Sequence, residues 1–149
     1  MEHSSQFCTF YLGDDLFGVD VQRVQEVILY QEMTPVPLAS SHVKGLINLR
    51  GQIVTAIETR EHLGMGPRPE GELPMNVVVR TTDDHAVSFL VDEIGDVVNV
   101  DESTFEDAPE AVKARTRNLI VGIFKLEGEL LLVLDIDRAL QATAAQHAA

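Results

Sequence analysis

The feature that most constrains this chain is an internal repeat, in which two different motifs each occur twice and in the same order. FGVD at residues 17–20 matches FLVD at residues 89–92, and INLRGQIVTAIETREHL at residues 47–63 matches FKLEGELLLVLDIDRAL at residues 124–140. Any two hairpins with glycine turns look alike, so one shared motif would be weak evidence. Two separated motifs in the same order favour true internal symmetry. We therefore predict two similar all-β units, each of about five strands and each ending in a short helix.

The strands of the repeat are apolar on both faces. In the segment QIVTAIE, Val54 and Ala56 lie on the face opposite to Ile53 and Ile57, yet all four are apolar. Strands of this kind are covered on both sides. Each unit has about 70 residues, close to the lower limit for a domain that folds alone. We therefore expect two small β-barrels of about five strands each, packed against each other or against a partner.

Local patterns predict the elements of the first half. Alternating residues around the turn at Gly13, Asp14 and Asp15 predict a hairpin over residues 7–20. Valines at positions 21, 24 and 27 recur at helical spacing, which predicts a short helical turn. A hairpin at 43–58 and a short helix at 59–63 complete a first unit over residues 7–63. The glycine- and proline-rich segment 64–74 is then predicted to be a connector.

The second half repeats this order and is predicted to span residues 75–140. A hairpin at 75–92 turns at residues 82–84 and continues into a strand at 93–101. A polar loop with one helical turn follows at 101–118, and then come two strands and a helix that begins near Asp135. Residues 141–149 are predicted to be a tail.

Composition excludes several classes of partner. With 24 acidic and 11 basic residues, the net charge of −13 repels nucleic acid and anionic membranes, although it also serves solubility. Cys8 is the only cysteine, which excludes internal disulfides and cysteine-based zinc sites. The sequence contains neither a signal-peptide pattern nor a long apolar span. We therefore expect a cytoplasmic protein without direct membrane insertion.

A search for catalytic chemistry finds no strong candidate. The sequence lacks a G-x-S-x-G nucleophile motif, and Gly64-Met65-Gly66 runs into Pro67 instead of a dinucleotide-binding helix. Glu58 and His62 could share one helix face as acid and base, but a solvated surface is the better interpretation. We therefore predict no catalytic residues, no metal and no cofactor, and we expect a protein that binds other macromolecules instead of an enzyme.

Arg50 stands out because it lies beside Gly51 at the tip of an apolar hairpin. Gly51, like Gly128 in the second repeat, provides the backbone conformation that a tight reversal needs. The turn would then project a guanidinium outward, where its planar donors suit a carboxylate or the carbonyls at a helix end. The alternative is that Arg50 folds back onto Glu26 or Glu58 as an ion pair within the chain.

Several blocks together resemble the CheW family of bacterial chemotaxis adaptors. They are VDVQRVQEVI, TPVPLASSHVKGLINLRGQIVTAIETREHLG, VSFLVDEIGDV and LLLVLDIDRAL, which extend in order over nearly the whole chain. The resemblance implies two small barrels around a shared hydrophobic centre. It also implies an adaptor that couples the cytoplasmic tips of chemoreceptors to the regulatory domain of the histidine kinase CheA, in membrane-associated receptor arrays and without catalytic activity.

The resemblance also implies a receptor-binding site. Arg50 matches the family's motif arginine, Val24 and Glu26 match its V-x-E segment, and Ile94 and Val97 match the apolar positions of the second barrel. The sequence departs from the family pattern at Glu58-Thr59-Arg60, where D-L-R is usual. We expect this departure to change the packing of the first barrel or the choice of partner.

Two alternatives to the receptor–kinase adaptor remain open at this point. One is a CheW-like adaptor of a pathway that controls an output other than flagella. The other is a regulatory domain that binds a small ligand in a cleft between the barrels. Such a cleft would need convergent polar groups in an apolar cavity.

Overall fold

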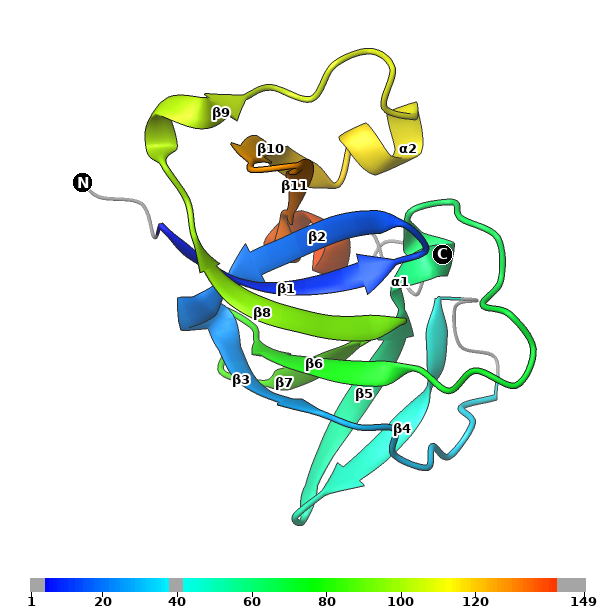
Figure 1. Cartoon of the computed structure of the whole chain (residues 1–149). Coiled ribbons are helices and arrows are strands. Elements are labelled where there is room, and N and C mark those ends of the chain that lie inside the picture. Colours follow the sequence, from blue (N-terminus) through cyan, green and yellow to red (C-terminus); the bar gives the residue numbers. More distant parts are fainter. Residues whose placement is uncertain (1–4, 38–41, 142–149) are drawn as a thin grey trace.

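The computed structural model describes residues 5–37 and 42–141, and it consists mainly of β-strands in two sheets (Figure 1). The first half contains β1 (Gln6–Leu12), β2 (Asp15–Asp20), η1 (Val21–Arg23), β3 (Val24–Ile28), β4 (Val43–Leu49), β5 (Gln52–Glu58) and α1 (Thr59–His62). The second half contains β6 (Met75–Arg80), β7 (Ala86–Val91), β8 (Glu93–Asn99), η2 (Glu102–Thr104), β9 (Phe105–Glu106), α2 (Ala114–Arg117), β10 (Ile120–Leu126) and β11 (Glu129–Leu134). Residues 136–141 are helical, and the rest of the predicted tail lies outside the described residues.

The strands form one sheet in the order β8-β1-β2-β11-β10-β9 and a second in the order β3-β6-β7-β5-β4. The predicted all-β fold of two units is therefore confirmed. Neither sheet closes into a barrel and one has six strands instead of five, but the two-sheet arrangement fits the predicted pair of small β units. The sixth strand, β9, comes from the segment predicted as a loop, where Phe105 and Glu106 pair with β10.

Each sheet takes its central hairpin from the other half of the sequence. The β1–β2 hairpin lies between β8 and β11, whereas the β6–β7 hairpin lies between β3 and β5. The parallel pairs β2–β11 and β7–β5 join the halves, so each FxVD strand lies beside the second repeated motif of the opposite half. The connector at 64–74 therefore divides the sequence but does not divide the sheets, because each sheet contains strands from residues 7–63 and from residues 75–140.

The central strands bury both of their faces, as the sequence suggested. Phe17 of β2 and Phe89 of β7 pack into one core cluster that both sheets share, and each is 0–1% exposed. Their neighbours Leu16 and Leu90 point the other way and fill separate clusters under each sheet. Three apolar layers thus account for strands without polar faces.

The predicted helical turn at residues 21–28 is wrong beyond its first three residues. Asp20 caps a short 3₁₀ turn by accepting a hydrogen bond from the Gln22 amide at 2.9 Å, and β3 then begins at Val24. β3 pairs with β6 in a register that joins Val24 to Val79 and Val27 to Val77. Because the register shifts between these two pairs, a β-bulge produces the spacing of three residues that resembled a helix.

The exchange of hairpins predicts that neither half folds alone. A fragment of residues 75–149 lacks β1 and β2, so β8 and β11 lose their partners and half of the shared core is missing. We expect poorly dispersed amide resonances from this fragment in ¹H–¹⁵N NMR. Mixing it with residues 1–74 should restore dispersion, which serves as the control. Well-dispersed spectra from either fragment alone would contradict the exchange.

Candidate functional site

Arg50 lies in the two-residue turn that joins β4 to β5. Leu49 pairs with Gln52 across the turn, and Arg50 and Gly51 have φ angles of 53° and 89°. Two successive positive φ angles are typical of the tight hairpin turn whose twist matches that of its strands. The Gly51 amide donates to Asn48 Oδ1 at 3.0 Å, which closes the turn. Gly128 has a φ angle of 86° in the corresponding turn between β10 and β11.

The Arg50 guanidinium forms an ion pair with Glu26 on β3. Of the two internal partners considered from the sequence, the structure selects Glu26, because Glu58 is bound by Arg68. The Arg50 side chain is 69% exposed and Glu26 is 21% exposed, so much of the guanidinium still faces solvent. Arg50 therefore retains donors for a further carboxylate while Glu26 limits where it points.

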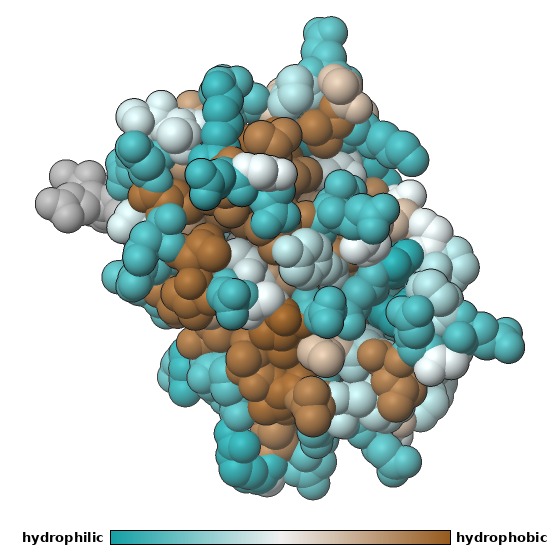
Figure 2. Space-filling model, in the orientation of Figure 1, coloured by the Kyte–Doolittle hydropathy of each residue, from teal (hydrophilic) through white to brown (hydrophobic). Residues whose placement is uncertain are grey.

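Four valine and isoleucine side chains form an apolar surface along the junction of the two sheets, which we call the seam surface: Val24, Val27, Ile94 and Val97. β8 pairs with β1 in the six-stranded sheet and contacts β6 of the other sheet. Figure 2 shows apolar side chains gathered over the region where β3, β6 and β8 run side by side in Figure 1.

Bulges in the two edge strands place these side chains on one face. Opposed residues in an antiparallel pair point to the same side, and Ile94 opposes Phe10 while Val97 opposes Cys8. Phe10 and Cys8 are two residues apart and both pack in the shared core, so Ile94 and Val97 face the same way. The bulge in β3 likewise turns Val24 and Val27 to one side, because they oppose Val79 and Val77 of β6.

The seam residues differ in exposure. Val24 and Ile94 are half-buried and pack against the shared core, whereas Val97 is 55% exposed and Val27 is 41% exposed. Val27 was not among the predicted site residues, because the V-x-E segment that pointed to this strand covers only Val24 and Glu26. The i, i+3 spacing of Val24 and Val27 was the signal that placed them on one face, although it predicted a helix.

Four charged side chains form a buried network beside α1. The Asp92 carboxylate accepts from Arg60 Nε at 2.8 Å and Nη2 at 2.5 Å, from Arg68 Nε at 2.8 Å, and from the Gly13 amide at 2.7 Å. Glu58 binds the Arg68 guanidinium at 2.8 and 3.0 Å and also caps α1 by accepting from the Arg60 amide. These four side chains are only 8–13% exposed.

The network gives Glu58, the first residue of the departure at Glu58-Thr59-Arg60, a structural role. Glu58 extends far enough to hold both oxygens against Arg68, a residue of the connector. The expectation that Glu58 and His62 are solvated surface groups is wrong, since they are 6% and 2% exposed. His62 Nε2 lies 2.6 Å from the Ala139 carbonyl oxygen, and its ring meets His42 edge to face at 4.3 Å. These contacts make Glu58 and His62 structural groups.

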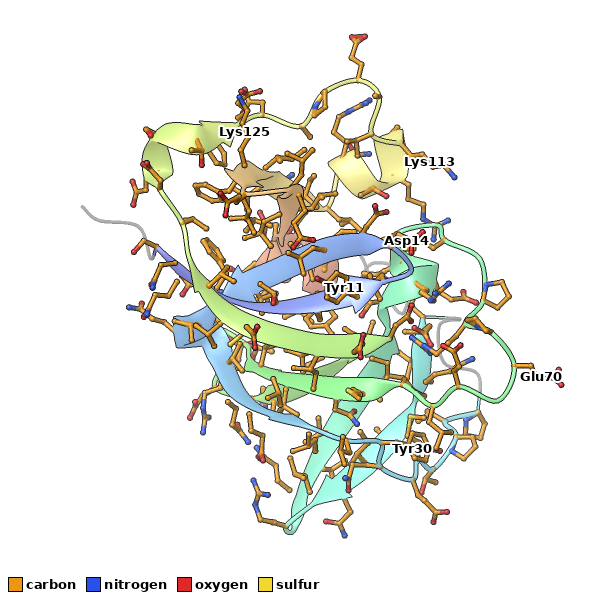
Figure 3. The ribbon with its side chains drawn as sticks, viewed as in Figure 1. Tyr11, Asp14, Tyr30, Glu70, Lys113 and Lys125 are labelled. Atoms are coloured by element: carbon orange, nitrogen blue, oxygen red, sulfur yellow. The ribbon has the colours of Figure 1, made fainter. Side chains whose placement is uncertain are left out.

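Asp92 has a shifted pKa. Burial by itself raises the pKa of this carboxyl, but hydrogen bonds from Arg60, the Gly13 amide and Arg68 outweigh burial and lower the pKa from 3.8 to about 2. Figure 3 shows Asp14 at the tip of the same β1–β2 hairpin, where it is exposed beside this network.

Other candidate sites were also considered. Within the described residues, no three His, Cys, Asp or Glu side chains are placed to hold a metal ion. Asp84 forms an ion pair with Arg80 at 2.7 Å in an exposed turn. Over residues 5–37 and 42–141, none of the helices has the length and apolar character needed to cross a bilayer.

Comparison with known proteins gives one consistent result. The model of the CheW-like domain family matches residues 6–144. The chemotaxis protein CheW of Bacillus subtilis (strain 168) is 32% identical over 141 residues, which cover 93% of this chain and 88% of that protein. CheW of Treponema pallidum (strain Nichols) is 28% identical over 147 residues, which cover 97% and 86%.

A solved structure shares the fold. The crystal structure of the scaffolding protein TtCheW from Thermoanaerobacter tengcongensis superposes with a TM-score of 0.81 at 24% identity, over 92% of each chain. This similarity confirms the two-sheet architecture.

The pKa of Asp92 predicts a specific loss of stability in acid. Because its pKa is lower in the folded chain than in the unfolded chain, the ionised carboxylate stabilises the fold above about pH 4. That contribution is lost as the pH falls toward 2. Asp92→Asn should lower the free energy of unfolding near pH 7 by about 3–5 kcal/mol, because it leaves buried arginines without their partner.

Urea unfolding between pH 2 and pH 7 measures this effect. Asp14→Asn, on the exposed turn nearby, is the matched control and should change stability by about 0.5 kcal/mol or less. If the free energy of unfolding depended on pH in the same way in the wild type and in Asp92→Asn, the network would not contribute this stability.

Proposed function

The chain belongs to the CheW-like domain family, and from that premise we propose that it is a chemotaxis adaptor that joins chemoreceptors to the histidine kinase CheA. It would act at membrane-associated receptor arrays and work by binding alone. The observation that carries the proposal is the seam surface, an apolar strip at the junction of the two sheets on which Val27 and Val97 are exposed. Chemotaxis relatives that match nearly the whole chain support this assignment.

The seam surface suits the helical hairpin at a receptor tip. Val27 and Val97 supply exposed apolar area, and an amphipathic helix can lay its apolar face on such a strip. Glu26 opposes Val78 in the pairing of β3 with β6, so it points to the face of β3 opposite to Val27 and carries its ion pair with Arg50 there. A carboxylate on the receptor helix can compete with Glu26 for the guanidinium or share it.

The surface is held rigidly, which favours an adaptor. Val24 and Ile94 anchor the strip in the shared core, and β8 is hydrogen-bonded along its length to β1. A rigid surface loses little conformational entropy when it binds. We propose that the regulatory domain of CheA binds elsewhere on the molecule, so that the adaptor can hold both proteins at once.

Arg50→Ala tests the role of the guanidinium. Arg50 already has a positive φ angle, so alanine adds little backbone strain, and the loss of an exposed ion pair costs about 0–1 kcal/mol. We expect thermal stability to stay nearly unchanged while affinity for a receptor signalling fragment falls about tenfold, the effect of about 1.4 kcal/mol. Isothermal titration calorimetry measures the affinity.

Two further variants separate the possible roles of Arg50. Arg50→Lys should also bind weakly, because an ammonium cannot reproduce the planar donors. Arg80→Ala removes the exposed ion pair with Asp84 at another hairpin and serves as the control, with unchanged binding. If Arg50→Ala lost much of its stability but kept its affinity for the receptor, the role of Arg50 would be to stabilise the fold and not to bind the receptor.

Val97→Asp tests the apolar strip separately. Val97 is 55% exposed, so the substitution should leave the fold intact while it places a charge where the receptor helix would pack. Leu73→Asp is the matched control, because Leu73 is 64% exposed but lies on the connector. In pulldowns with receptor and CheA, we expect the Val97→Asp variant to lose binding to the receptor and to retain binding to the kinase. Equal losses in both variants would contradict the seam surface as the receptor site.

A further inference from the structure

A cavity of about 550 Å³ opens beside the six-stranded sheet, and none of its lining residues belongs to the seam surface. Phenylalanine rings form one wall. Phe124 meets Phe7 with ring centroids 5.6 Å apart and Phe105 with centroids 5.1 Å apart. Phe7 and Phe124 are buried, whereas Phe105 is 38% exposed. Aromatic rings therefore line the cavity both in its buried part and at its opening.

Carboxylates face the same space from several elements. Asp20 is the last residue of β2, Glu102 lies on η2, and Asp135 and Asp137 follow β11. The one arginine of the lining, Arg23, is engaged by Asp137 at 2.8 and 3.2 Å and by the Arg80 carbonyl oxygen at 3.0 and 3.1 Å. Asp135 forms an ion pair with Arg138, which lies outside the lining. In the part of the chain that the structure describes, Asp20 and Glu102 form no ion pair, and they leave the cavity with an excess of negative charge.

These carboxylates are held in position. Asp20 accepts from the Gln22 amide at 2.9 Å. Asp135 accepts from the Arg138 amide at 3.0 Å and also forms an ion pair with the Arg138 side chain at 3.8 Å. One hydrogen bond occupies only part of the acceptor capacity of a carboxylate. Glu102 is exposed and forms no ion pair within the described residues. A ligand can therefore meet oriented acceptors inside the cavity and a solvated carboxylate at its edge.

We propose that this cavity binds a small organic cation that carries an aromatic or branched apolar body. The volume lies within the range of small-molecule sites, which is about 300–1,000 Å³. The faces of aromatic rings attract ammonium groups, and the surplus carboxylates favour the same charge. The proposal goes beyond the adaptor function and does not depend on it, because the lining excludes Arg50 and all four seam residues.

A titration of the full chain with matched probes tests the proposal. Benzyltrimethylammonium carries the required charge, and phenylacetate has a similar ring with the opposite charge. Methyl-resolved NMR should show saturable shifts at Val121 and Val133, which line the cavity, with the cation and not with the anion. Glu102→Gln and Phe105→Leu should each weaken binding about two- to fivefold, as expected for one exposed charge or one ring.

The control variant is Glu70→Gln, because Glu70 projects from the connector into solvent (Figure 3) and does not line the cavity. Its affinity for the cation should equal that of the wild type. Binding of both probes with equal affinity, or an equal loss in Glu70→Gln, would overturn the proposal. If a blocked lysine peptide bound more tightly than benzyltrimethylammonium, the cavity would be a site for a lysine side chain of another protein. That result would also overturn the proposal.

Discussion

The buried ion-pair network around Asp92 is the interaction on which the arrangement of the two sheets depends. Asp92 lies where the chain leaves β7 in one sheet and enters β8 in the other. It accepts from Arg60 after β5 and from the Gly13 amide in the turn between β1 and β2. One carboxylate thus binds groups from both sheets, and Arg68 adds the connector. Burying these charges is unfavourable without such complete pairing.

The network also fixes the ends of the strands that border the seam surface. β8 begins directly after Asp92 and carries Ile94 and Val97. If the junction at Asp92 shifted, β8 would move relative to β3, and the apolar strip would lose its continuity. The ion-pair network therefore positions the strand that carries part of the seam surface, although no charged group of the network belongs to that surface.

The exchange of the central hairpins is a second feature that holds the two sheets rigidly together. Because β1–β2 and β6–β7 each complete the sheet of the other half, one half cannot move away without breaking strand pairs. The shared core, which includes Phe17 and Phe89, lies between the sheets and couples them further. An adaptor gains from this construction, since two partners that bind one rigid body are held at a fixed separation.

The local elements were determined by the sequence itself. Alternation of side chains and the Arg50-Gly51 turn depend on neighbours a few residues apart, so the hairpins and the repeat could be predicted. The strands with two apolar faces also indicated that both faces of each sheet are covered by other parts of the protein. Only the tertiary structure decided which sheet each hairpin joins, that Glu58 is buried against Arg68, and that Val27 lies beside Val24. These features depend on pairing between distant segments, which the packing of both sheets selects together and which local sequence does not encode.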